Sequence, residues 1–398
     1  MKLQSVCHYT FSTAGGAGRV AKQLSSGLNN LGFDSYVKSL TDGDIKDCRW
    51  NRPILTGKAL FDFFIVRKSL DQSLFTLYRQ SNGIPIAQKN STIQHLHWMP
   101  GVATISEIGQ LLQSVRPTVW TLHDMWAFTG GCHHSMECDG YEDKCSQCPQ
   151  VKRPFSHSVE QNLQSKRRGF NLNINFAGIT PSNWLKKRAE QSEVFRGSKF
   201  TVIPNPIDTE LFSPRPTRGN RDEVKLVIGC NATNLLDPMK GVKSLINALE
   251  KFQYQCPSIE VVLLAIGGGS ISSQKIEIRQ LGFLSDQHQI TLAYSQMDLF
   301  VSLSQAEVFP LSIAEAQSCG LPVICLDTGG MPEMIQQNVN GYVVKSSSDL
   351  VVALNKFIQS EISQEKMRAA ARNHALENYS TEVVVNKYID IYSSLISD

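Results

Sequence analysis

Two glutamates flank the start of a short helix in the second half of the chain. In the segment EVFPLSIAEAQSCGLPVI, Pro310 suits the first position of a helix, and Gly320 suits the position just past its end. No Ser, Thr, Asp or Asn directly precedes Pro310, so several N–H groups of the first turn lack an obvious side-chain acceptor. Free N–H donors at a helix start bind phosphate. With Glu307 and Glu315 beside them, one interpretation of these residues is a pocket for a nucleotide sugar.

The same segment also fits a purely structural role. Ser312 and Glu315 form the S-x-x-E pattern of a capping box, in which the serine caps the helix and the glutamate reaches back, worth about 1 kcal/mol. Glu307 would then be an exposed loop acid. From these residues alone, both interpretations remain open.

A glycine-rich turn follows the strand-like segment LQSVCHYT near the N-terminus. Gly15, Gly16 and Gly18 would let a backbone approach a ligand closely. Their spacing differs from the GxGxxG fingerprint of dinucleotide-binding domains, and the next strand, DSYVKSL, ends without the expected acidic residue. The turn therefore indicates ligand contact without indicating a dinucleotide.

Four of the ten cysteines lie in one loop, TGGCHHSMECDGYEDKCSQCP. They are Cys132, Cys138, Cys145 and Cys148. Four thiolates can close a structural zinc site, and His133 or His134 could replace one of them. Only one pair has the usual C-x2-C spacing, so buried or reducible thiols in an ordered loop are the alternative.

Strand-like and helix-like segments alternate along both halves of the chain. The segment RVAKQLSSGLNNLGF places Val20, Leu24 and Leu28 on one helix face and ends at Gly32. Later strand-like segments are STIQHLHW, PTVWTLHD, INFAGITPS, VKLVIGCNA, IEVVLLAIGGG, MDLFVSLS and PVICLD. The pattern predicts two doubly wound α/β domains, residues 1–203 and 217–379, joined by a proline-rich linker at 204–216. A last amphipathic helix, 380–398, could pack back on the first domain.

Length and composition agree with two folded domains. The 398 residues exceed the roughly 250–300 that one core usually organises. A hydrophobic content of 41% and a charged content of 19% are typical of a globular protein, and a net charge of +3 gives no argument for a nucleic-acid partner. No signal peptide and no membrane-spanning segment is recognisable, so we expect a soluble, cytoplasmic protein.

Several segments together resemble the retaining glycosyltransferases of family 4, which have the GT-B fold. In chain order they are GGAG, TLHD, MKGVKSLINALE, LGF, EVFPLSIAEAQSCGLPVI and TGGMPEMIQQNVNGYVV. The resemblance spans nearly the whole chain, and the order and spacing of the segments make it specific. It implies two Rossmann-like domains facing a central cleft. Similar cysteine-rich loops occur after HDxW in a bacterial subset that resembles polysaccharide-assembly enzymes.

The resemblance also implies roles for individual residues. Glu315 is similar to the carboxylate that binds the ribose hydroxyls of the donor, and Glu307 to the acid beside the sugar ring. Lys240 resembles the lysine that neutralises the leaving diphosphate, and His123 the histidine that touches the donor sugar. Asp124 could hold the ring of His123. The implied donor-binding residues are Gly16, Asn231, Phe309, Pro310, Leu311 and Glu315.

One position departs from the family pattern. Many relatives have an arginine after the strand where this chain has GCNATN, and Asn231 or Asn234 could donate a hydrogen bond there without supplying charge. His95 and His97, in QHLHW, are further strand-end residues that could line the acceptor side.

The resemblance implies a retaining transferase that moves a hexosyl group from a nucleoside diphosphate sugar to a glycan or lipid-linked oligosaccharide in surface polysaccharide biosynthesis, such as that of lipopolysaccharide. No divalent metal is expected in catalysis, and the D-x-D at Asp42 to Asp44 lies in an early polar turn. The segment at 61–80 mixes large apolar and basic residues, which fits either core packing or peripheral contact with the inner face of a membrane. An epimerase or phosphorylase on the same fold, or a scaffold with a decayed donor site, are the rival functions.

Overall fold

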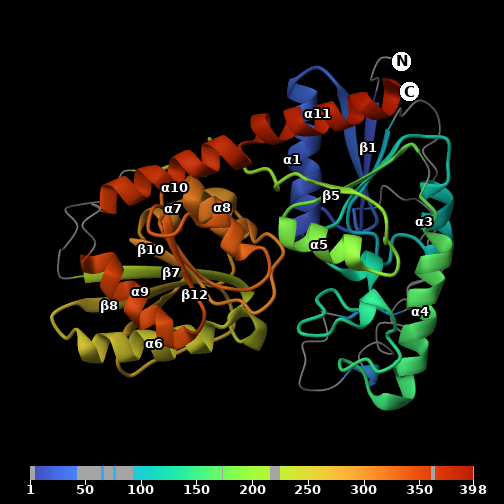
Figure 1. The fold of residues 1–398 in the computed structure, drawn as a ribbon. Coiled ribbons are helices and arrows are strands. Elements are labelled where there is room, and N and C mark those ends of the chain that lie inside the picture. Colours follow the sequence, from blue (N-terminus) through green and yellow to red (C-terminus); the bar gives the residue numbers. More distant parts are fainter. Residues whose placement is uncertain are drawn as a thin grey trace. The chain divides into compact units, whose positions relative to one another are not determined.

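The computed structural model describes residues 5–42, 64–66, 75–77, 93–172, 174–215, 225–359 and 364–397. The chain divides into two compact units between Pro206 and Ile207, and the C-terminal segment from Val384 onward belongs to the first unit (Figure 1). Each unit is built on a six-stranded parallel sheet with helices, so the predicted α/β fold with two Rossmann-like domains is confirmed.

The sheet of the first unit has the strand order β2-β1-β3-β4-β5-β6. Its strands are β1 (Ser5–Thr10), β2 (Asp34–Ser39), β3 (Ile93–Leu96), β4 (Thr118–Thr121), β5 (Phe176–Thr180) and β6 (Phe200–Val202). Its helices are α1 (Gly16–Asn30), α3 (Ile105–Leu112), α4 (Ser156–Gly169), α5 (Asn183–Gln191) and most of α11 (Thr381–Ser397), with 3-10 turns at Trp126–Phe128, Gly140–Glu142 and Arg153–Phe155. The chain runs from β1 to β2 and then restarts on the other side of β1 with β3, so the strand order reverses between β1 and β3.

Helix α1 forms where its apolar residues predicted it. Val20, Leu24 and Leu28 are all buried, and the chain leaves the helix through Gly32 with a φ of +83°. The start of α1 packs so closely on the preceding loop that a Cβ at Gly18 would lie 1.9 Å from the carbonyl oxygen of Ser12. Glycine at position 18 is therefore required by packing.

The sheet of the second unit has the order β12-β11-β10-β7-β8-β9. Its strands are β7 (Lys225–Asn234), β8 (Glu260–Gly268), β9 (Glu277–Gln280), β10 (Leu299–Ser302), β11 (Val323–Leu326) and β12 (Gly341–Val344). Its helices are α6 (Val242–Gln255), α7 (Gln287–Ser295), α8 (Leu311–Ser318), α9 (Ser347–Gln359) and α10 (Gln364–Tyr379), with 3-10 turns at Pro238–Lys240 and Met331–Met334. Here the order reverses between β7 and β10.

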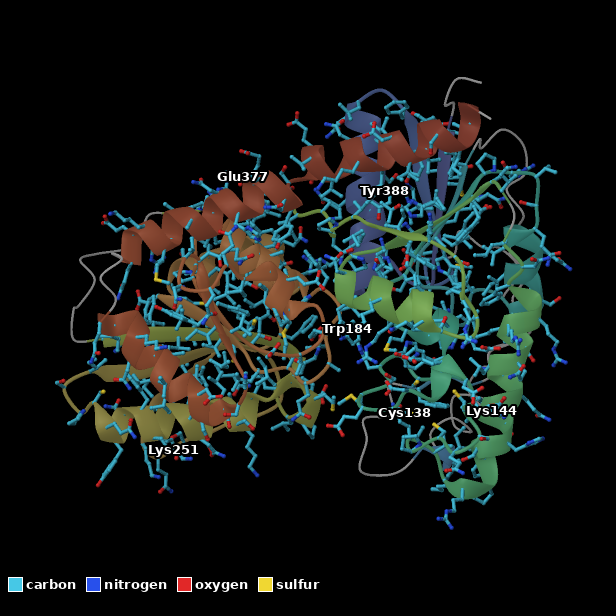
Figure 2. The ribbon with its side chains drawn as sticks, viewed as in Figure 1. Cys138, Lys144, Trp184, Lys251, Glu377 and Tyr388 are labelled. Atoms are coloured by element: carbon cyan, nitrogen blue, oxygen red, sulfur yellow. The ribbon has the colours of Figure 1, made fainter. Side chains whose placement is uncertain are left out.

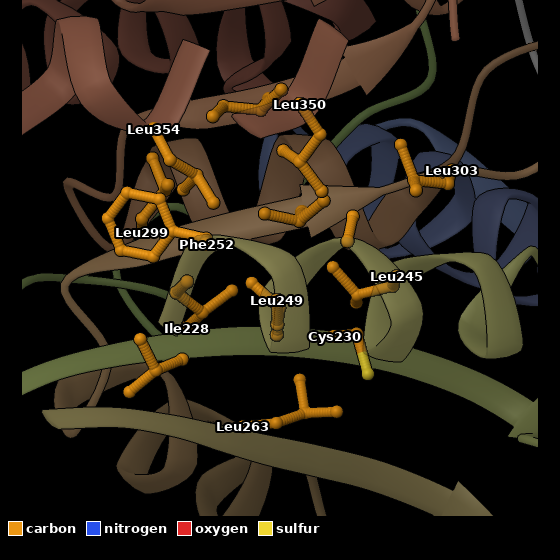
Figure 3. Packing of buried hydrophobic residues seen from close by; sticks show 14 of the residues in the cluster. Ile228, Cys230, Leu245, Leu249, Phe252, Leu263, Leu299, Leu303, Leu350 and Leu354 are labelled. Atoms are coloured by element: carbon orange, nitrogen blue, oxygen red, sulfur yellow. The ribbon is translucent and has the colours of Figure 1, made fainter. Parts of the chain in front are cut away.

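The second sheet is buried on both faces, which explains its long apolar strands. Leu263 of β8 packs with α6 and α9, whose Leu249 and Leu354 lie on the same side of the sheet (Figure 3). The next residue, Leu264, points to the opposite face and joins the cluster formed with α7 and α8. This alternation along β8 is the two-residue period of a strand.

The segment expected to be a linker contributes to the second unit. Ile207 and Phe212 are buried in the core that also holds Tyr379, and the Ile207 N–H donates to the Tyr379 carbonyl at 2.7 Å. Arg372 binds the carbonyl oxygens of Thr209 and Phe212, each at 2.9 Å. Residues 207–215 are therefore anchored by apolar burial and by a guanidinium.

Helix α11 begins in the second unit and belongs to the first from Val384 onward. In the first unit its Tyr388 and Tyr392 are fully buried, and their hydroxyls contact Thr121 at 2.9 Å and His95 at 2.7 Å. Within the described parts of the chain, none of the helices combines the length and apolar character needed to span a bilayer.

Candidate functional site

An ion pair lies at the point where the strand order of the second sheet reverses. Lys240 follows β7 and Glu307 follows β10, and these two strands are neighbours in the sheet. The Lys240 ammonium lies 2.7 Å from a carboxylate oxygen of Glu307. The side chains keep 33% and 20% of their surface exposed, so water or a ligand can reach both. Crevices at such reversal points are the usual ligand sites of open α/β sheets.

The turn that carries Lys240 packs directly on the segment that leads to Glu307. The Gln305 N–H donates to the Met239 carbonyl at 2.8 Å, and the Glu307 carbonyl accepts the N–H of Gly330 at 2.9 Å. Gly241 has a φ of +68°, and a Cβ at this position would lie 2.2 Å from the Leu303 carbonyl oxygen. Backbone contacts therefore hold the three loops after β7, β10 and β11 together.

Replacing Gly241 with alanine is expected to loosen this arrangement. The left-handed conformation and the clash with Leu303 together should lower the free energy of unfolding of the second unit by about 2 kcal/mol or more. Gly282 is a matched control, because it has a φ of +71° with nothing within 4 Å of the added Cβ. Urea unfolding followed by circular dichroism should show a larger loss for Gly241→Ala than for Gly282→Ala. Equal losses would mean that the close packing on Leu303 contributes nothing.

The start of helix α8 is not capped by a side chain. Pro310 is the N-cap residue and Leu311 the first helical residue, one position later than predicted. Ser312 lies inside the helix and does not cap it, so the capping-box interpretation is wrong. Gly320 follows the helix with a φ of +76°, as predicted. Phe309 is buried and packs edge-on against Tyr379 at 5.2 Å, which fixes the approach to the helix.

Glu315 belongs to a short hydrogen-bonded chain under the start of α8. Its carboxylate is 1% exposed and accepts a hydrogen bond from the Tyr294 hydroxyl at 3.2 Å. The Asn231 amide donates to the same hydroxyl at 3.1 Å. Burial, reinforced by the negative charge of Glu315, raises the pKa of Tyr294 well above its usual value, so the phenol stays protonated and can donate. Asn231, in β7, and Glu315 are thus linked through a residue that sequence analysis missed.

In the first unit, histidines gather within β1 and β3 and just after β3 and β4. His123 Nε2 lies 3.0 Å from His97 Nδ1, and His97 Nε2 lies 3.0 Å from His8 Nδ1. His95 contacts the Tyr392 hydroxyl through Nδ1 at 2.7 Å and the Thr121 hydroxyl through Nε2 at 2.8 Å. His8, in the interior of β1, was not singled out from the sequence. The segment CHYT is the only signal that could have found it, as a polar residue within an apolar strand.

Asp124 does not hold the ring of His123, contrary to expectation. One of its oxygens accepts from the Trp98 indole at 2.7 Å and lies 2.6 Å from His133 Nδ1, and the other accepts the Trp126 N–H at 2.8 Å. Burial acts to raise the pKa of Asp124, but the charge and hydrogen bond of His133 and the bond from Trp126 outweigh it and lower the pKa to about 2. Asp124 therefore orders the loop that follows β4.

The glycines at the start of α1 differ in whether packing requires them. Gly16 is the first residue of α1, is exposed, and would have nothing within 4 Å of an added Cβ. Packing inside the unit therefore does not require glycine at position 16, in contrast to Gly18. Asp42 accepts a hydrogen bond from the Thr13 hydroxyl at 2.5 Å, whereas the rest of the D-x-D and most of residues 61–80 lie outside the described residues.

The four clustered cysteines line one cavity of about 220 Å³ in the first unit. Figure 2 labels two of its lining residues, Cys138 and Lys144. Burial raises the pKa of the Cys145 thiol to about 12. His133 cannot substitute for a cysteine here, because Thr76 and Asp124 take both of its ring nitrogens. The zinc site stays a prediction.

A different trio meets the distance requirement for a metal among the described residues. Ligand atoms of His8, His95 and His97 lie within 4.8 Å of one another. Both nitrogens of His95 are engaged with hydroxyl groups, however, and His8 and His97 share a direct contact. A metal would have to displace these contacts, so the arrangement favours a hydrogen-bonded histidine cluster.

Comparison with known proteins assigns both halves of the chain to related families. Residues 14–211 match the family described as Glycosyltransferase Family 4, and residues 232–374 match the family described as Glycosyl transferases group 1. Together the two matches cover most of the chain.

Two curated relatives illustrate the range of similarity. The protein named "Putative colanic acid biosynthesis glycosyl transferase WcaC" of Escherichia coli (strain K12) is 24% identical over 318 residues, which cover 76% of this chain and 75% of that protein. N-acetyl-alpha-D-glucosaminyl L-malate synthase of Bacillus anthracis is 29% identical over 220 residues, which cover 52% of this chain and 58% of that protein.

Solved structures share the fold over the whole length. Sucrose-phosphate synthase from Thermosynechococcus elongatus has a TM-score of 0.66 at 16% identity and 99% coverage of both chains. A glycosyltransferase from Rickettsia africae has a TM-score of 0.65 at 16% identity and full coverage of both chains. Anabaena HepE in complex with UDP-glucose has a TM-score of 0.57 at 16% identity, with 99% of this chain and 100% of that chain covered. These similarities confirm the predicted GT-B fold class.

Proposed function

We propose that this chain, a glycosyltransferase of the GT4 type by the two families that it matches, transfers a hexosyl group with retention from a nucleoside diphosphate sugar to a glycan or lipid-linked acceptor. The solved complex of HepE with UDP-glucose supports a nucleotide sugar as the donor. The similarity to WcaC, which is named for colanic acid biosynthesis, supports a place in polysaccharide biosynthesis. A cytoplasmic reaction, at the inner face of the membrane, is part of the proposal.

The observation that carries the proposal is the pair of Lys240 and Glu307 at the strand-order reversal. Glycosyl transfer needs positive charge at the departing diphosphate and a group that orients the sugar ring. Lys240 supplies the charge, and Glu307, 2.7 Å away, accepts hydrogen bonds from sugar hydroxyls next to that diphosphate. In the free enzyme the Lys240 ammonium and the Glu307 carboxylate form an ion pair, and this contact holds both side chains in position before the donor binds.

The start of α8 and the chain below it complete the donor site in this proposal. The uncapped turn at Phe309, Pro310 and Leu311 offers the backbone N–H groups of Phe309 and Leu311 to the diphosphate, since Pro310 has no N–H. Glu315 binds the ribose hydroxyls, with Tyr294 and Asn231 holding its carboxylate in place. His123 and Gly16 of the first unit contact the sugar and the phosphate or acceptor. Because protein groups supply the positive potential, the reaction is proposed to proceed without a divalent metal.

Replacement of Glu315 by glutamine tests the donor site. The amide oxygen can still accept from Tyr294, so we expect the fold to persist while donor affinity falls at least tenfold, since a hydrogen bond to a charged group contributes about 1.5–3 kcal/mol. A panel of UDP-, GDP- and ADP-sugars, scored by thermal stabilisation of the wild type, first identifies the donor. Titration of that donor into the variant then gives the change in affinity.

The control for this substitution is Glu365→Gln in α10, which removes the same charge from an exposed position in the same unit. It is expected to bind the donor like the wild type. Unchanged affinity in Glu315→Gln would remove Glu315 from the donor site. If no nucleotide sugar stabilises the wild type, the transferase proposal itself is contradicted, and the scaffold function becomes the better one.

A further inference from the structure

Three histidines of the first unit form a continuous chain from the interior of the sheet to its carboxyl edge. His8 lies in β1, His97 directly follows β3, and His123 follows β4. His8 Nδ1 lies 3.0 Å from His97 Nε2, and His97 Nδ1 lies 3.0 Å from His123 Nε2. In each contact one nitrogen must carry the hydrogen and the other must accept it. Because a neutral ring has a single N–H, both hydrogen bonds must point the same way along the chain.

The three rings are neutral at physiological pH. Burial lowers the pKa of His8 to about 3 and that of His123 to about 4. Burial, together with the neighbouring His95 and His8, lowers the pKa of His97 well below its usual value. The state of the chain is therefore set by tautomers, and it has two alternatives, with the N–H groups directed inward or outward.

The inner end decides between these alternatives. His8 is fully buried, and its Nε2 has no hydrogen-bond partner in the described part of the chain. If the N–H groups pointed inward, this Nε2 would carry a buried hydrogen without an acceptor, which is the rarer kind of unsatisfied group in folded proteins. If they point outward, Nε2 keeps only a lone pair. At the outer end His123 is half-buried, so water or a ligand can satisfy its remaining nitrogen in either state.

We propose that the histidine chain is directed outward, with His8 Nδ1–H donating to His97 Nε2 and His97 Nδ1–H donating to His123 Nε2. His123 then carries its hydrogen on Nδ1, the nitrogen that His97 leaves free. His8 and His97 are positioning residues that fix the tautomer of His123. The ligand atom that His123 meets must be an acceptor, such as a hydroxyl or phosphate oxygen, and His123 cannot act there as a general base.

The surrounding contacts hold the chain in this arrangement. The Trp120 indole donates to the His97 carbonyl at 3.1 Å, which fixes the backbone between the two hydrogen bonds. The His97 ring stacks on His123 with centroids 5.3 Å apart and on His95 at 4.2 Å. His95 itself lies outside the chain, because its nitrogens contact Tyr392 and Thr121. It is therefore a matched control, as buried as His97 and two residues before it in the sequence.

The test is ¹⁵N NMR of the full-length protein labelled at histidine, in which the shift of each ring nitrogen shows whether it carries a hydrogen. Resonances are assigned with single-histidine variants. We expect His8, His97 and His123 all to be protonated on Nδ1, although free histidine favours Nε2. In His97→Leu, His123 should revert towards Nε2–H, whereas His95→Gln should leave it on Nδ1. A wild-type His123 with its hydrogen on Nε2 would overturn the proposal, as would a stoichiometric metal that is lost in His8→Leu.

The consequence for turnover rests on the proposed function and is measured separately. With His123 at the donor sugar, His97→Leu should lower kcat about tenfold, the usual size of one hydrogen bond's effect, and His157→Gln, at an exposed position of α4, should leave kcat near that of the wild type. If the NMR shows the outward chain and kcat is unchanged in His97→Leu, the tautomer assignment holds and the role of His123 in transfer fails. Should the leucine variants not fold, the more conservative His8→Gln, His97→Gln and His123→Gln supply the assignments, and the wild-type shifts then decide the direction of the chain.

Discussion

Acidification from pH 7 to pH 5 is expected to destabilise the first unit by several kcal/mol. Burial holds the pKa of His8 at about 3 and that of His123 at about 4, and it places the pKa values of His95 and His97 well below 6.5. Below pH 6.5 the unfolded chain binds protons that the folded unit does not, so stability falls as the pH falls, until the folded pKa values are reached. His8 and His123 then each cost about 1.4 kcal/mol per pH unit, or about 2 kcal/mol at pH 5.

His8 and His123 together remove on the order of 4 kcal/mol, a large part of the 5–15 kcal/mol that stabilises a typical domain, and His95 and His97 add to the loss in the same direction. Two other groups of the first unit with a shifted pKa do not cancel this effect. The lowered pKa of Asp124, about 2, changes the stability only at pH values below this range, and that of Lys166, about 7, changes it mainly above pH 7. All five tryptophans lie before residue 207, so tryptophan fluorescence in urea reports on the first unit alone.

Variants give the pH experiment its control. His95→Gln is expected to reduce the steepness of the pH dependence between pH 6 and pH 5 by about a quarter, because one of four titrating groups is removed. His157 lies on the exposed face of α4, and His157→Gln should leave the steepness unchanged. A first unit that is as stable at pH 5 as at pH 7 would show that the buried histidines are protonated at little cost.

The elements that sequence analysis predicted are those whose buried positions are apolar. Helix α1 follows from Val20, Leu24 and Leu28, all of which are buried. Helix α4 was missed because its buried side includes Asn162 and Lys166, which interrupt the apolar period. Lys166 is buried by donating to the carbonyl oxygens of Trp126 and Thr129 and by lying 3.7 Å over the Trp126 ring. These partners are distant in the sequence, so no local pattern predicts that this lysine faces the core.

The candidate site also has features that the sequence predicts and features that it does not. The chemical types of Lys240, Glu307 and Glu315 were visible in the sequence, but their neighbours were not. Lys240 meets Glu307 across 67 residues because β7 and β10 are adjacent in the sheet, and only the strand order decides that. Tyr294 reaches Glu315 from a helix whose apolar pattern gives no sign of a hydroxyl in the site. Contacts between residues at the ends of neighbouring strands depend on the strand order. Sequence patterns predict the fold class, but they do not give the order of the strands in the sheet.

Replacing Lys240 with alanine is expected to reduce kcat by about 10²–10³-fold while leaving the fold nearly as stable. The large effect follows because the ammonium stabilises charge that develops on the departing diphosphate, and such groups contribute this much in enzyme sites. The small effect on stability follows because the ion pair with Glu307 is partly exposed, with 33% and 20% of the two side chains open to solvent, and such pairs contribute about 1 kcal/mol or less.

Lys243→Ala is the control for this substitution, because it removes an exposed lysine three residues later and should retain wild-type kcat. Initial rates at saturating donor, with thermal unfolding of the same samples, separate the two effects. A Lys240→Ala enzyme that turns over at the wild-type rate would place the departing diphosphate elsewhere, and the pairing of Lys240 with Glu307 would then be a structural ion pair alone.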